Sequence, residues 1–218
     1  MKHQTTKTLY DYWTQLRGER VAPFRHEVDP GSIRSILGDT FILDAVDRKT
    51  YNFRLAGTRL CAAYCRELKG RNILDLWSGK DREAIASLLS AIVEDGAAAV
   101  IGVTLHNERD QSIPAELLFL PLRQNGDRHT RIIGCFAPHD QPYWLGIHPA
   151  VRQPIVSLRL IWPDEAPRFL YTGAEAPAEP QFATVALERS RYAGIHAHHG
   201  GAAKRVAHLT VYNGGRTN

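Results

Sequence analysis

Two segments of the chain are apolar at almost every position. They span residues 115–122 and 132–137, and their apolar runs comprise Leu117, Leu118, Phe119, Leu120, Ile132, Ile133, Cys135 and Phe136. Asn125-Gly126 between them is a dipeptide typical of hairpin turns. A strand with one face in water alternates apolar and polar residues, so strands without alternation need cover on both faces. The sequence therefore predicts an antiparallel hairpin within a sheet that is covered on both sides.

The first residues of the chain supply one candidate cover. Leu9, Tyr12, Trp13 and Leu16 are spaced i, i+3, i+4 and i+7, which places all four on one face of a helix. This face either caps the sheet of its own chain or packs on a second copy as a homodimer contact.

Turn and capping residues divide the rest of the chain into further elements. The sequence predicts helices over 30–37, 58–68 and 79–95, strands over 41–43, 51–55 and 99–106, and a further strand over 156–162. The predicted fold class is α+β, with a five-stranded antiparallel sheet that carries helices on one face. The N-terminal amphipathic helix covers the other face, and a weakly structured extension follows the sheet.

Length and composition predict one folded core with extensions. A chain of 218 residues with 44% hydrophobic positions can bury one sizeable core. We expect a cap helix and its connection over 1–28, the core over 29–140, an extension and a linker rich in proline and alanine over 141–181, and a basic tail over 182–218. Residues 207–212 form an apolar patch within that tail.

The net charge is concentrated at the end of the chain. Residues 188–218 hold one acid, Glu188, and five basic residues, Arg189, Arg191, Lys204, Arg205 and Arg216, which equals the net charge of +4 of the whole chain. The remainder is formally neutral, which does not favour nucleic acid as a partner.

Polar residues follow Met1 and no long apolar run occurs, so we expect no membrane partner and a cytoplasmic location. Three cysteines do not suit a disulfide framework, and we expect them to be buried.

Four short motifs connect the chain to a known family. They are Leu9-Tyr10-Asp11-Tyr12-Trp13, Phe53-Arg54-Leu55-Ala56-Gly57-Thr58, Gly70-Arg71-Asn72-Ile73-Leu74-Asp75-Leu76-Trp77 and Leu120-Pro121-Leu122. With these motifs, residues 8–138 resemble a bacterial PAS family of stand-alone sensory and regulatory proteins. The resemblance implies a PAS fold and a role in signal transduction without catalysis.

The third motif also bears on the cofactor. Gly70-Arg71-Asn72 resembles the start of the motif of flavin-binding, light-sensing PAS proteins, in which a reactive cysteine follows the asparagine. Ile73 stands at that position, and its side chain cannot form a thiol adduct with flavin. The asparagine and glutamine that hold the flavin in that branch have no counterparts in 117–122 or 132–137. The sequence thus excludes flavin-cysteinyl photochemistry and leaves the cofactor unassigned.

The resemblance implies a central cavity walled by the predicted helices. Tyr64, Arg71 and Trp77 flank those helices, and Leu105 and Leu117 on predicted strands complete the candidate lining. An aromatic lining with one guanidinium suits a small anionic or aromatic ligand. In the alternative, the tyrosine and tryptophan fill the core and the arginine lies in solvent.

The remaining histidines and cysteines do not predict a metal site. Cys61 and Cys65 lie one helical turn apart, but no nearby ligand completes the four that zinc prefers. His106 ends a predicted strand on the face opposite its apolar residues, so the sequence does not favour heme ligation. The tail cluster of His196, His198 and His199 lies among glycines that give it no fixed geometry.

Three classes of function are compatible with these sequence features. The first is a sensor that binds a small ligand and signals through the sheet and the first helix, with another protein or itself as partner. The second is an adaptor with a filled cavity, in which residues 207–212 dock on a partner by strand addition. The third is an enzyme, for which the sequence offers no catalytic motif of a familiar kind.

Overall fold

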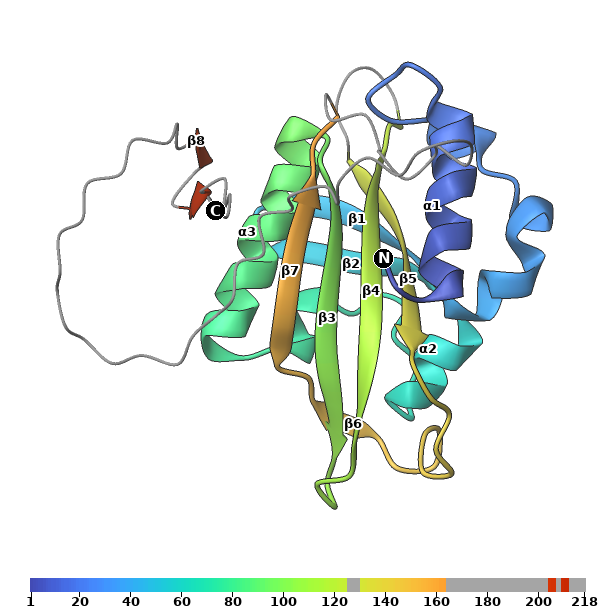
Figure 1. Cartoon of the computed structure of the whole chain (residues 1–218), viewed down its shortest axis with the longest axis vertical. Helices are drawn as coiled ribbons and strands as arrows, with labels where there is room; N and C mark the ends of the chain where they lie inside the picture. Colours follow the sequence, from blue (N-terminus) through green and yellow to red (C-terminus); the bar gives the residue numbers. More distant parts are fainter. Residues whose placement is uncertain (125–129, 164–203, 207–208, 212–218) are drawn as a thin grey trace, which may run out of the picture.

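The structure is a computed structural model, and it describes residues 1–124, 130–163, 204–206 and 209–211. Its centre is a seven-stranded antiparallel sheet with the order β2-β1-β5-β4-β3, in which β6 and β7 both pair with β3 (Figure 1). The strands are β1 Thr40–Asp47, β2 Thr50–Ala56, β3 Ala98–Asn107, β4 Ser112–Leu122, β5 Arg131–Pro138, β6 Ala150–Arg152 and β7 Ile155–Ile161. The five predicted strands are all present, and β4 and β5 pair as the predicted hairpin.

The predicted count of five strands is wrong, because β6 and β7 complete the sheet. β7 corresponds to the further strand predicted over 156–162 and pairs with β3 from Ala98↔Ile161 to Val103↔Ile155. β6 has three residues, too few to show an alternating pattern, which explains why the sequence did not reveal it. Both strands come from the part of the chain predicted to be an extension.

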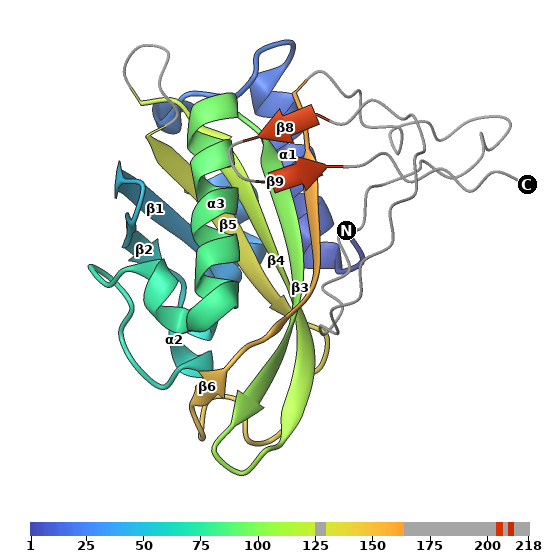
Figure 2. The same cartoon turned by 90° about the vertical axis from the view of Figure 1, so that its left-hand side faces the viewer.

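The N-terminal helix α1, Gln4–Arg17, lies on one face of the sheet (Figures 1 and 2). Leu9, Tyr10 and Trp13 are buried there, whereas Tyr12 and Leu16 are partly buried at the margin of the contact. The sheet residues beneath them include Ile42, Val100, Leu118, Leu120, Ile133 and Cys135. The face predicted as a cap or dimer contact therefore packs on the chain's own sheet.

A buried carboxylate holds the start of α1 against the sheet. Glu116 on β4 accepts hydrogen bonds from the backbone N–H groups of Lys2, at 2.9 Å, and His3, at 3.3 Å. The Thr6 hydroxyl donates to the same carboxylate. Burial raises the pKa of Glu116, but these hydrogen bonds outweigh it and leave the pKa below its ordinary value of 4.5. The charged carboxylate thus stabilises the first turn of the helix.

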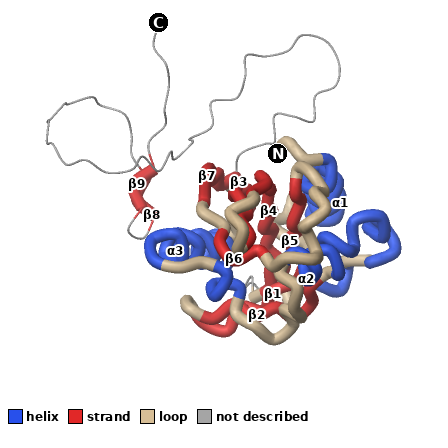
Figure 3. Tube along the Cα trace, turned by 90° about the horizontal axis from the view of Figure 1, so that it is seen from below, coloured by secondary structure: helices blue, strands red, loops and turns tan. Residues whose placement is uncertain are grey.

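The opposite face of the sheet carries α2 Thr58–Ala63, the 3₁₀-helix η3 Ile73–Leu76 and α3 Gly79–Asp95 (Figure 3). α2 is shorter than the predicted helix over 58–68. It ends because the backbone at Cys65 turns into the left-handed region, with φ of 48°. This turn brings both Tyr64 and Leu68 into the core. The Gly96 backbone, with φ of 69°, ends α3 as its pattern predicted.

Two 3₁₀ segments connect α1 to the sheet. They are η1 Arg25–Glu27 and η2 Pro30–Asp39, and the second coincides with the helix predicted over 30–37. The Asp29 side chain accepts hydrogen bonds from the backbone N–H groups of Gly31 and Ser32, which caps η2. Ile33 and Ile36 are buried against α1 and the sheet, so η2 extends the layer on this face.

Two short strands, β8 Lys204–Val206 and β9 Leu209–Val211, pair with each other near the end of the chain. β9 covers the described part of the apolar patch predicted over 207–212. Nearly all of the Pro- and Ala-rich linker, most of the predicted basic tail and the cluster of His196, His198 and His199 lie outside the described residues. No helix in the described part of the chain is long and apolar enough to cross a membrane.

Candidate functional site

Four of the five predicted cavity residues lie in one buried cluster between the sheet and the helices α2 and α3. Tyr64, Trp77, Leu105 and Leu117 are each less than 7% exposed. Their neighbours in the same cluster include the large side chains Phe41, Tyr51, Phe53, Phe119, Phe136 and Trp144. The ring centroids of Phe41 and Phe119 are 5.5 Å apart in an edge-to-face contact. Aromatic and aliphatic side chains thus occupy the region where a central cavity was predicted.

Arg71, the fifth predicted residue, is exposed and does not line the pocket between α2, η3 and β6. Its Nε donates a hydrogen bond to the Glu67 carbonyl at 3.0 Å. The adjacent Asn72 has a structural role, because its Oδ1 accepts from the backbone N–H groups of Tyr51 and Leu74 at 3.2 Å. The predicted guanidinium of the site therefore does not come from this arginine.

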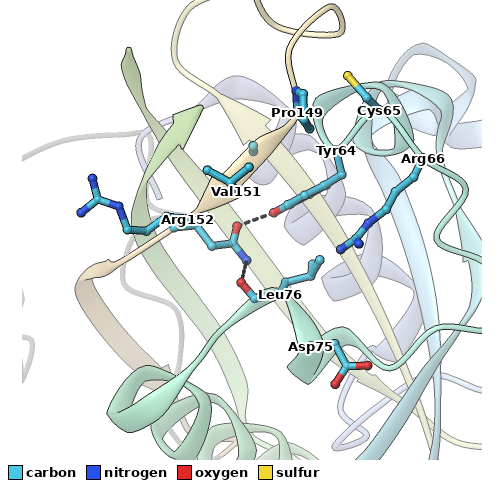
Figure 4. A pocket seen from close by; sticks show the side chains of 10 residues that line it. Tyr64, Cys65, Arg66, Asp75, Leu76, Pro149, Val151 and Arg152 are labelled. Atoms are coloured by element: carbon cyan, nitrogen blue, oxygen red, sulfur yellow. Dashed lines mark hydrogen bonds between the residues drawn. The ribbon is translucent and has the colours of Figure 1, made fainter. Parts of the chain in front are cut away.

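A pocket opens beside this cluster, between the end of α2, η3 and β6 (Figure 4). Its volume is about 480 Å³, within the range of small-molecule sites. It is lined by Tyr64, Cys65, Arg66, Asp75, Leu76, Pro149, Ala150, Val151, Arg152 and Gln153. Tyr64 is the one predicted cavity residue that takes part in it.

Two buried polar side chains form a hydrogen-bonded chain at this pocket. The Tyr64 hydroxyl donates to Oε1 of Gln153, and Nε2 of Gln153 donates to the Leu76 carbonyl at 3.4 Å. The glutamine is 3% exposed. Burial raises the pKa of the Tyr64 phenol well above its ordinary value, so the hydroxyl stays protonated and keeps its role as a donor. These bonds join α2, η3 and the end of β6 at one point.

The charges at the rim leave one guanidinium without an ion pair. Asp75 pairs with Arg82 at 2.9 Å, and Arg152 pairs with Asp110 at 3.0 Å. Among the described residues, Arg66 has no such partner; the residue is exposed, and Figure 4 shows its guanidinium extending across the pocket toward Leu76. The pocket therefore carries a net positive charge, which suits an anionic group.

Sequence reasoning missed Arg66 and Gln153. The glutamine follows a strand of three residues and lies about ninety positions after the tyrosine that it contacts, so no local pattern connects the two. The arginine lay inside a predicted helix that in fact ends at Ala63. The only local signal for Arg66 was its position two residues after Tyr64, a predicted cavity residue.

The cysteines and His106 differ in part from expectation. Cys135 is buried, but Cys61 is half-buried and Cys65 is exposed, so the prediction that all three are buried is wrong for two of them. Within the described residues, no group of three or more His, Cys, Asp or Glu side chains is placed to hold a metal ion. His106 is partly exposed, with Nδ1 3.4 Å from the Asp110 carboxylate.

Residues 1–137 match a protein family described as PAS domain. The chain belongs to this PAS-domain family. The match covers more than half of the chain and supports a sensory signalling domain. A search of curated proteins found no match.

Solved structures with a similar fold include other PAS domains. One is a light-oxygen-voltage domain studied with a flavin analogue, at 14% identity and a TM-score of 0.41, covering 52% of this chain and 85% of that chain. Another is the PAS domain of an HTR-like protein from Haloarcula marismortui, at 16% identity and a TM-score of 0.34, covering 50% and 89%.

The boundary of the family match divides the pocket in two. The side formed by residues 64–66 and 75–76 lies within the PAS match, whereas residues 149–153 lie beyond its end at residue 137. The pocket is therefore formed jointly by the PAS domain and the segment that follows it.

Proposed function

We propose that this protein is a non-catalytic PAS-type sensor that binds a small organic anion in the pocket between α2, η3 and β6. The observation that carries the proposal is the unpaired guanidinium of Arg66 beside the buried Tyr64–Gln153 hydrogen bond. A guanidinium binds a carboxylate or phosphate through charge-assisted hydrogen bonds, which are stronger than neutral ones.

The position of the pocket also suits the transmission of a signal. β6 pairs with β3 through His106↔Arg152 and Asn107↔Ala150, and the backbone N–H of Ile155 donates to the Asp81 carboxylate on α3 at 3.3 Å. A ligand held between α2 and β6 would change how the helical layer contacts the edge of the sheet. If β6 and β7 can adopt a second arrangement, a ligand that binds one arrangement more tightly shifts the balance between the two, which is the form that ligand-driven signalling takes.

Isothermal titration with benzoate, succinate and inorganic phosphate tests the proposal. We expect at least one of these anions to bind the wild-type protein and Arg66→Gln to weaken that binding about tenfold or more, because it removes one charge-assisted hydrogen bond. Arg48→Gln removes the same charge from an exposed ion pair with Glu94 and should leave affinity unchanged. Absence of binding by all three anions, or equal affinity in Arg66→Gln, would contradict the proposal.

The filled interior favours a second candidate, a protein-interaction adaptor that needs no ligand. Its support is the aromatic cluster that occupies the central region of the PAS domain. Such an adaptor would use its surface, including the exposed side chains of Tyr143, Ile147 and Val151 near β6, which are 55–69% exposed. Pulldown of a partner that depends on these three side chains and persists in Arg66→Gln would support the adaptor instead of the sensor.

A further inference from the structure

A second hollow lies on the other face of the sheet and shares no residue with the pocket at Arg66. Its volume is about 380 Å³, and it lies between η2, the end of β2 and the start of α2. We name it the η2 groove; it is lined by Arg25, Val28, Pro30, Ile33, Leu37, Gly38, Thr40, Ile42, Leu55, Ala56, Gly57, Thr58 and Ile133. The size is at the lower end of the range for small-molecule sites.

The lining of the η2 groove is almost entirely apolar. Its side chains are mainly aliphatic, and Leu55 is 41% exposed although it is a large apolar residue. The Thr40 hydroxyl is already used, because it donates to the Ile36 carbonyl at 2.9 Å. Such a surface suits a hydrocarbon chain, which gains free energy when it leaves water.

Arg25 is the one charged residue of the lining. Its Nε is buried from solvent and has no hydrogen-bond partner, so a donor remains unsatisfied in this structure. Buried donors of this kind are normally paired. No carboxylate lines the groove to accept from it.

Three acids near Arg25 or η2 in the sequence, Glu27, Asp29 and Asp39, are engaged elsewhere. Glu27 pairs with Arg20 at 3.0 Å, and Asp39 pairs with Arg59. Asp29 accepts hydrogen bonds from the backbone N–H groups at the start of η2. The positive charge at the groove is therefore not neutralised by these neighbours.

We propose that the η2 groove binds an aliphatic monocarboxylate. The hydrocarbon chain lies against the apolar lining, and the carboxylate accepts hydrogen bonds from the Arg25 guanidinium. This ligand satisfies both features together, because an uncharged hydrocarbon offers no acceptor to Nε of Arg25 and a short anion leaves the aliphatic surface in water.

Isothermal titration of the full chain with decanoate tests this site. We expect decanoate to bind the wild-type protein, with decanol and acetate at least about tenfold weaker because each lacks one half of the recognition. Arg25→Gln should weaken decanoate about tenfold or more. Arg34→Gln is the matched control, since Arg34 is an exposed residue of η2 that does not line the groove, and it should leave affinity unchanged.

A second variant tests the site independently, in case Arg25→Gln fails to fold. Leu55 is partly exposed, so Leu55→Glu should fold and repel the carboxylate while it removes apolar surface. Arg66→Gln should leave decanoate affinity unchanged, which separates this site from the proposed sensory pocket. No binding of decanoate, equal binding of decanol, or unchanged affinity in both Arg25→Gln and Leu55→Glu would overturn the inference.

Discussion

Substitution of Trp13 tests whether α1 is an integral cover of the sheet. This side chain is 4% exposed, packs on the apolar face of β4 and β5, and donates from Nε1 to the Pro121 carbonyl at 2.8 Å. Truncation of a buried tryptophan to alanine costs about 3–5 kcal/mol. Loss of the Nε1 hydrogen bond contributes about 1 kcal/mol to that cost. We therefore expect Trp13→Ala to lower the free energy of unfolding by about 3–5 kcal/mol, a large fraction of the roughly 5–15 kcal/mol typical of a domain.

Urea denaturation followed by far-ultraviolet circular dichroism measures this loss without relying on tryptophan fluorescence. Trp13→Phe keeps most of the ring packing and should cost about 1–2 kcal/mol, mainly from the lost donor. Tyr143→Ala is the control, since that side chain is 69% exposed, and it should change stability by less than about 0.5 kcal/mol. A loss below about 1 kcal/mol in Trp13→Ala would show that α1 does not shelter the sheet.

Three further substitutions have outcomes that follow from individual contacts. Gly134→Ala would push a Cβ against the Leu118 carbonyl, and we expect a loss of about 1–3 kcal/mol in urea denaturation, whereas an unchanged midpoint would refute the tight packing. The pKa of Glu116 is lowered in the fold, so the stabilisation from its charge is complete above the ordinary pKa of 4.5 and is lost as pH falls through the lower folded pKa. Glu116→Gln should therefore reduce the loss of stability on acidification, measured as the free energy of unfolding against pH. An unchanged loss of stability at acid pH would contradict this. Tyr64→Phe leaves Oε1 of Gln153 without its donor and should lower the free energy of unfolding by about 1–2 kcal/mol, measured by thermal unfolding. An unchanged stability would show that this hydrogen bond does not form.

The layered fold could be predicted because its strongest signals are local. The nearly continuous apolar runs at 117–120 and 132–136 require cover on two faces, and the spacing of Leu9 and Trp13 predicts a helix able to provide it. Tyr12 and Leu16, assigned to the same face, lie at its margin, because Tyr10 takes a central place instead. Spacing defines a helical face only to within about one residue's rotation.

The candidate site could be predicted only in part, because it depends on contacts between distant segments. Tyr64 belongs to the apolar helix predicted over 58–68, and Trp77 directly precedes the helix predicted over 79–95, so burial of both was one expected outcome; both lie in the core. The guanidinium was assigned to Arg71, although the backbone turn at Cys65 places Arg66 at the pocket. A left-handed backbone at a residue other than glycine leaves little trace in sequence, so this exchange could not be foreseen.

Nuclear magnetic resonance of the labelled wild-type protein, titrated with benzoate, succinate and phosphate, tests most directly where a small anion binds. We predict chemical-shift changes that saturate and concentrate in the amides of residues 64–66, 76 and 150–153. Changes centred on the buried cluster around Phe119, or no saturable change with any of the three anions, would contradict a binding site at Arg66.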